Sequence, residues 1–102
     1  MRMIMLVQFP AEPFNTLVRK GTLAAKMKKI LDAIKPESIY FTEIDGHRGA
    51  MAVVDLEVAS DVARLAEPWF IGFNANVEFR IAMTPKTWDR QTWLPSERSG
   101  VR

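Results

Sequence analysis

The order of patterned segments along the chain is the feature that most constrains its fold. Met1–Phe9 is almost continuously apolar, which is typical of a short strand buried on both faces, and Pro10 ends it. At 100° per residue, the apolar side chains between Asn15 and Ile34 gather on one side of a helix, and Pro36 ends that helix. We therefore expect a strand followed by one continuous helix over residues 15–34.

A hairpin and a second helix follow. Ser38–Ile44 has the aromatic and β-branched content of a strand, Ala50–Val58 has the pattern of the returning strand, and the residues between them include two turn-forming glycines. Ser60 predicts the start of the second helix, and Asn76–Met83 alternates as a strand does. The order βαββαβ predicts an α+β, ferredoxin-like fold over residues 1–85, with a four-stranded antiparallel sheet and two helices on one face.

Composition excludes several classes of function. The 102 residues, 48% of them hydrophobic, suffice for one domain with a core. The chain has no cysteine and one histidine, so we expect no metal site, and nothing in it indicates a cofactor. Its first apolar stretch is too short for a signal-peptide core or a membrane span, which predicts a cytoplasmic protein without a membrane partner.

Nucleic-acid binding is also not expected. RNA-recognition domains share this strand order, but they carry aromatic residues on the third strand. Ala50–Val58 contains no aromatic residue.

Alternation along the strands predicts two different sheet faces. One is wholly apolar and suits the helices, whereas the other mixes aliphatic with charged residues. The second face is expected to hold Ile4, Leu6, Met51 and Val53 together with Arg2, Gln8, Asp55, Glu57, Glu78 and Arg80. So many aliphatic residues on an open surface indicate an interaction patch, and a second copy of the sheet would bury it. We therefore expect a homodimer.

Five short motifs carry a resemblance to a known family. They are Pro36-Glu37…Tyr40-Phe41, Gly46-x-Arg48, Glu67-Pro68-Trp69-Phe70, Asn74-Ala75-x-Val77-Glu78-Phe79 and Met83-Thr84-Pro85. In these motifs the chain resembles a small uncharacterised bacterial family of the dimeric α+β-barrel superfamily, to which antibiotic-biosynthesis monooxygenases and muconolactone isomerases belong. The resemblance implies a two-sheet dimer with sites in the cleft between sheet and helices. It implies no particular reaction, because the superfamily hosts several.

The candidate catalytic residues are His47, Arg80 and Glu78. A histidine next to a carboxylate can act as a general base near neutral pH, although a histidine in a turn is commonly a solvated surface residue. Arg80 can hold a carboxylate or enolate, and Glu78, Glu57 or Asp55 can move a proton if buried. The alternative for these charges is an ion-pair network between subunits.

The candidate ligand-binding residues are Tyr40, Glu57, Trp69, Phe73 and Lys20. Trp69 and Phe73 can form an aromatic wall for a flat ligand or pack in the core, and Tyr40 can add a hydroxyl group. Lys20 lies on the apolar stripe of the predicted helix, where it can present an ammonium group to an anionic ligand or extend past the helix end.

Two functions remain open. One is a small-molecule binder or a cofactor-free enzyme, an oxygenase or isomerase, with a small organic ligand in the cleft between sheet and helices. The alternative is a non-catalytic dimeric assembly or regulatory module. In either case, residues 86–102 form a tail with Trp88 and Trp93 that we expect to pack on the body or on the partner subunit.

Overall fold

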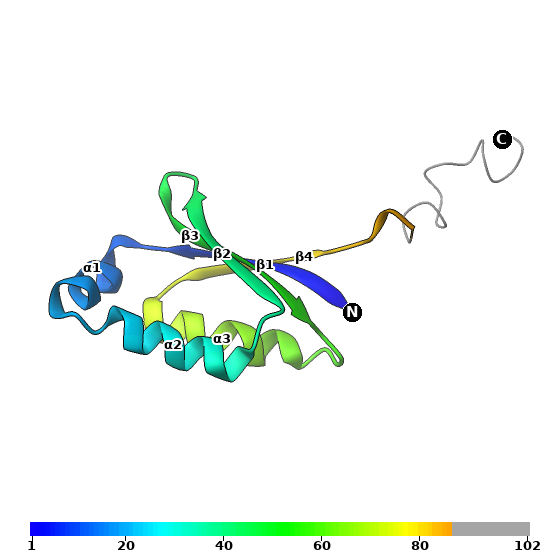
Figure 1. Cartoon of the computed structure of the whole chain (residues 1–102), viewed down its shortest axis with the longest axis horizontal. Coiled ribbons are helices and arrows are strands. Elements are labelled where there is room, and N and C mark those ends of the chain that lie inside the picture. The colour runs from blue at the N-terminus through cyan, green and yellow to red at the C-terminus, as the bar shows by residue number, and fades with distance from the viewer. Residues whose placement is uncertain (87–102) are drawn as a thin grey trace, which may run out of the picture.

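The computed structural model describes residues 1–86 and confirms the predicted ferredoxin-like α+β architecture. Its elements are β1 (Arg2–Phe9), α1 (Ala11–Lys20), α2 (Leu23–Ile34), β2 (Ser38–Ile44), β3 (His47–Asp55), α3 (Asp61–Phe73) and β4 (Asn76–Ile81). The sheet is antiparallel with strand order β2-β3-β1-β4, and α2 and α3 lie along one of its faces (Figure 1). Residues 87–102 of the predicted tail, with Trp88 and Trp93, fall outside the described residues.

The prediction of one continuous helix over residues 15–34 is wrong, because the chain turns at Gly21. Gly21 has φ +73°, in the left-handed region that glycine adopts without steric cost. Its N–H donates to the carbonyl of Val18 at 3.1 Å, and the N–H of Thr22 donates to the carbonyl of Leu17 at 3.0 Å. This pair of bonds ends α1 as a Schellman-type cap, so α1 lies at the end of the sheet where β1 finishes (Figure 1).

The core lies between the sheet and the two long helices. Alternate residues of β1, namely Met3, Met5, Val7 and Phe9, point toward the helices and are buried. Trp69 and Phe73 of α3 are fully buried against Phe9, with ring centroids 5.8 and 5.1 Å from that ring. The indole N–H of Trp69 is buried and has no hydrogen-bond partner within residues 1–86.

The start of α3 is held by the carboxylate of Asp61. Oδ2 accepts hydrogen bonds from the backbone N–H groups of Glu57 and Val58, at 2.9 and 3.2 Å, and Oδ1 accepts one from Nε of Arg64 at 3.1 Å. These donors, the N–H of Glu57 first, lower the pKa of Asp61 below its ordinary value. The ionised carboxylate thus fixes the loop between β3 and α3.

None of the helices in residues 1–86 has the length and apolar character needed to cross a membrane.

Candidate functional site

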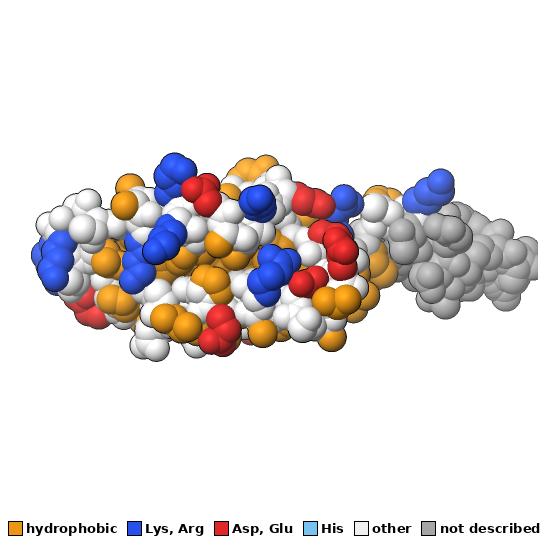
Figure 2. All heavy atoms as spheres, turned by 90° about the horizontal axis from the view of Figure 1, so that it is seen from below, with side chains coloured by type: hydrophobic (Ala, Val, Ile, Leu, Met, Phe, Trp, Pro, Cys, Tyr) orange, Lys and Arg blue, Asp and Glu red, His pale blue; other side chains and the backbone are white. Residues whose placement is uncertain are grey.

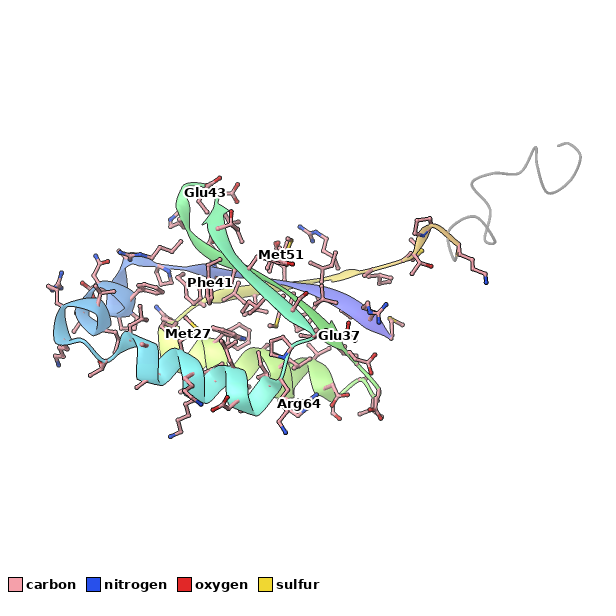
Figure 3. The ribbon with its side chains drawn as sticks, viewed as in Figure 1. Met27, Glu37, Phe41, Glu43, Met51 and Arg64 are labelled. Atoms are coloured by element: carbon pink, nitrogen blue, oxygen red, sulfur yellow. The ribbon has the colours of Figure 1, made fainter. Side chains whose placement is uncertain are left out.

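An apolar cleft of about 390 Å³ opens between the sheet and helices α1 and α2. Its lining consists of Phe9, Phe14, Leu23, Ala24, Met27, Phe41, Thr42, Arg48 and Gly49. Figure 3 shows Met27 of α2 and Phe41 of β2 pointing toward one another across this space. The volume is within the range of about 300–1,000 Å³ that is usual for small-molecule sites.

The aromatic side of the cleft continues into the core. The ring of Phe14 in α1 contacts the buried ring of Phe9 edge to face, with the two centroids 5.2 Å apart. The centroid of the Phe73 ring lies 5.7 Å from that of Phe14. Phe41 remains 56% exposed, although it is on the sheet face that the helices cover. An aromatic ring left so accessible at the mouth of an apolar cleft provides a surface on which a flat apolar ligand can pack.

Arg48 is the charged residue of this lining. It is the second residue of β3, and its guanidinium carbon lies 4.4 Å from the centroid of the Phe14 ring, a cation–π distance. Nη1 of Arg48 donates to Oδ1 of Asn15 at 2.6 Å. Both of these partners belong to α1 and both are neutral, so neither forms an ion pair with the guanidinium at the rim of the cleft.

His47 lies on the opposite face of the sheet from the cleft. Its Nδ1 is 3.1 Å from the backbone carbonyl oxygen of Asp45 and 3.4 Å from Nε2 of Gln8, whose Oε1 accepts a hydrogen bond from Asn76 at 3.1 Å. The contact with Asp45 is thus made by the backbone and not by the carboxylate. The histidine is exposed within a row of neutral polar groups near the hairpin turn.

The predicted charged constellation is divided in the structure. Arg80 and Glu78 form an ion pair of 3.1 Å on β4, and Asp55 instead accepts a bond from the amino group of Met1 at 3.2 Å. Glu57 does not lie on the sheet face as expected, because β3 ends at Asp55 and Glu57 belongs to the loop before α3. These ion pairs are solvent-exposed, where such pairs contribute little to stability.

The other predicted ligand-binding residues also lie outside the cleft lining. Tyr40 is 63% exposed on the open face of the sheet, which is the face opposite the helices. Lys20 is exposed at the end of α1, and the turn at Gly21 separates it from the apolar stripe of α2. Trp69 and Phe73 belong to the core, with Phe73 directly behind Phe14.

Four important cleft residues were not among the predicted site residues. They are Phe14, Met27, Phe41 and Arg48. The motif Gly46-x-Arg48 was the available signal for the arginine, because alternation along β3 places residue 48 on the face of Ala50 and Ala52.

A second hollow lies on the outer surface between α2 and α3. It has a volume of about 520 Å³, and its lining combines apolar residues such as Ile30 and Ile71 with four charged ones, Lys26, Lys29, Arg64 and Glu67. Figure 2 shows this side of the molecule, with lysine and arginine side chains around exposed apolar ones. This hollow has no aromatic wall and it faces away from the sheet, so the cleft at Arg48 is the better candidate for a small ligand.

In the part of the chain that the structure describes, no three histidine, aspartate or glutamate side chains are grouped to hold a metal ion. A scan of protein-family models and a search of curated proteins give no match to the chain.

Proposed function

We propose that this protein binds a small organic molecule in the cleft between its sheet and helices α1 and α2. The observation that carries the proposal is the composition of the cleft wall, in which the rings of Phe9, Phe14 and Phe41 surround a space with one cation, Arg48, at its rim. Binding sites for small molecules combine a mostly apolar wall with a few oriented polar groups in this way. The resemblance to the dimeric α+β-barrel superfamily supports the same location.

Binding is favoured over catalysis by the polar groups available. Within residues 1–86, the polar side chains of the cleft wall are the hydroxyl of Thr42 and the guanidinium of Arg48. Neither group is among the side chains that commonly act as general bases, which are those of histidine, aspartate, glutamate, lysine, tyrosine and cysteine. An oxygenase or isomerase reaction is the alternative, and the ligand itself would then have to supply the acid–base group.

The open face of the sheet supports a second proposal, that two copies of the chain associate through it. Leu6 and Met51 are Cα partners at its centre, and Tyr40 is the partner of Met51 on the next strand. Met51 and Tyr40 are 40% and 63% exposed in the single chain. Ion pairs at the margins carry both signs of charge, which suits the self-complementary contact that two-fold symmetry requires. If the cleft binds nothing, this association is the alternative function.

A thermal-shift screen of phenolic, keto-acid and aliphatic carboxylic metabolites tests the ligand proposal on two matched variants. Ala24 and Ala25 are both exposed on α2, but Ala24 lines the cleft and Ala25 does not. A ligand at 100 times its Kd stabilises the folded state by about 2.7 kcal/mol. We expect this stabilisation in the wild type and in Ala25→Phe, and its loss in Ala24→Phe, where the new ring fills the cleft.

Two results would contradict the proposal. One is a flat response of the wild type across the library. The other is a compound that stabilises Ala24→Phe as much as it stabilises Ala25→Phe, because its site would then lie elsewhere on the molecule.

A further inference from the structure

We propose that the ligand of the cleft is an apolar monocarboxylate whose carboxylate is held by Arg48. This inference rests on the proposed binding site and adds the chemical class of its occupant. The apolar body of the ligand would lie among Phe14, Met27 and Phe41, with its charged end at the rim.

Arg48 differs from the other arginines of the described residues in its partners. Arg2, Arg19, Arg64 and Arg80 each form an ion pair with a carboxylate, at 2.9 to 3.1 Å. Arg48 alone among the five has no ion pair within the described residues, and its contacts are with the ring of Phe14 and the amide oxygen of Asn15. Its positive charge is therefore available to an anion from outside the chain.

The carboxylate opposite Arg48 on the neighbouring strand forms its hydrogen bond within the hairpin. Glu43 is the Cα partner of Arg48 on β2, the position from which a cross-strand ion pair would normally form. Its Oε2 instead accepts a hydrogen bond from the backbone N–H of Gly46 at 2.7 Å. Figure 3 shows Glu43 at the tip of the hairpin, beyond the cleft side chains Met27 and Phe41.

The geometry of the guanidinium favours a carboxylate. Arginine has five N–H donors in a planar fork, and only one of them has a hydrogen-bond acceptor among the described residues, Oδ1 of Asn15. The contact with the ring of Phe14 and the bond to Asn15 hold the guanidinium at the rim, and its remaining donors can pair with both oxygens of a planar anion.

The charge of the cleft wall favours a single negative charge. A dianionic phosphate monoester would meet one cation in an otherwise apolar wall and would keep an uncompensated charge next to apolar surface. A monocarboxylate is neutralised by Arg48 alone.

A matched pair of probes tests the inference on the full chain. 4-Phenylbutyrate and 4-phenylbutanamide have nearly the same shape and differ in charge. Because hydrogen bonds to charged groups are roughly twice as strong as neutral ones, we expect the wild type to bind the acid about ten-fold more tightly than the amide by NMR titration. Arg48→Met should bring the two affinities to within about two-fold of each other, because it removes the charge and keeps the apolar contact.

Two further variants complete the design. Arg48→Lys keeps the charge without the fork and should retain an intermediate preference for the acid, which keeps the test valid if the methionine variant does not fold. Lys28→Met removes a cation of α2 that does not line the cleft and should leave the ratio of the two affinities unchanged.

The outcomes separate the two proposals. Equal binding of acid and amide by the wild type, or a full preference retained in Arg48→Met, overturns the carboxylate assignment and leaves the cleft as a ligand site. Binding of neither probe, together with a flat metabolite screen, overturns both. Binding of phenyl phosphate in preference to both probes overturns the monocarboxylate class alone.

Discussion

The two faces of the sheet are built from the same strands but have very different surroundings. On β1, Met5 is fully buried under the helices, whereas its neighbour Leu6 points to the open face. On β3, Ala52 is fully buried and Met51 remains 40% exposed. The closed face, which the helices cover, packs into the core on which folding depends. The open face has apolar side chains that a single copy leaves in contact with water. This difference is the basis of the proposal that two copies of the chain associate through the open face.

The largest expected effect concerns the closed face. Phe73→Ala removes a fully buried ring that contacts Phe9, Phe14 and Trp69, and it should lower the free energy of unfolding by about 3–5 kcal/mol. Phe70, three residues earlier on α3, is 41% exposed, so Phe70→Ala is a matched control that should cost about 1 kcal/mol or less. Urea denaturation measures both. Equal losses would mean that the closed face is not the main source of stability.

A second prediction tests whether the open face is an interface. Met51→Glu places a charge at the centre of this face and should raise the dissociation constant of a dimer by about 100-fold or more, because the charge would be buried without a partner. Analytical ultracentrifugation measures the change. Ile71→Glu is the control, since Ile71 is 81% exposed on α3 and its substitution should leave the association unchanged. A wild type that sediments as a monomer at high concentration would refute the dimer.

A third, smaller effect concerns the loop that leads into the helix covering the closed face. The pKa of Asp61 is lowered in the folded state, so its contribution to stability is complete above about pH 4 and is lost as the pH falls through that lowered value. Asp61→Asn should be less stable at pH 7, and its unfolding temperature should fall less between pH 4 and pH 2. Thermal unfolding across this pH range measures both slopes. Parallel curves for the two proteins would show that the carboxylate does not hold the loop.

The sequence predicted well what depends on local periodicity. Period-two alternation was enough to place Ile4, Leu6, Met51 and Val53 on one face, and it also placed Arg80 beside Glu78. Alternation did not predict where β3 ends, because the strand pattern continues past Asp55 in the sequence. Glu57 was therefore counted with the sheet although it lies in a loop.

The cleft could not be predicted because it depends on one backbone conformation. Apart from Lys20, the apolar stripe continues across Gly21 with the same period, so periodicity favours a continuous helix. Only the left-handed conformation of Gly21 separates α1 from α2 and brings Phe14 and Asn15 to the side chain of Arg48. Glycine weakens a helix without determining where it turns, and the partners of the new segment are set by tertiary packing.

The separation of α1 from the rest of the fold also has a consequence for how this protein can change. α1 contributes Phe14 to the cleft wall and Asn15 to the orientation of Arg48, yet none of its residues is fully buried. Substitutions there should cost less stability than substitutions under the sheet, because they leave no large cavity. Ligand preference can therefore vary through α1 while the buried faces of the other elements stay constant. The segment that shapes the site, α1, is thus the helix without a buried residue, and its substitutions should cost little stability.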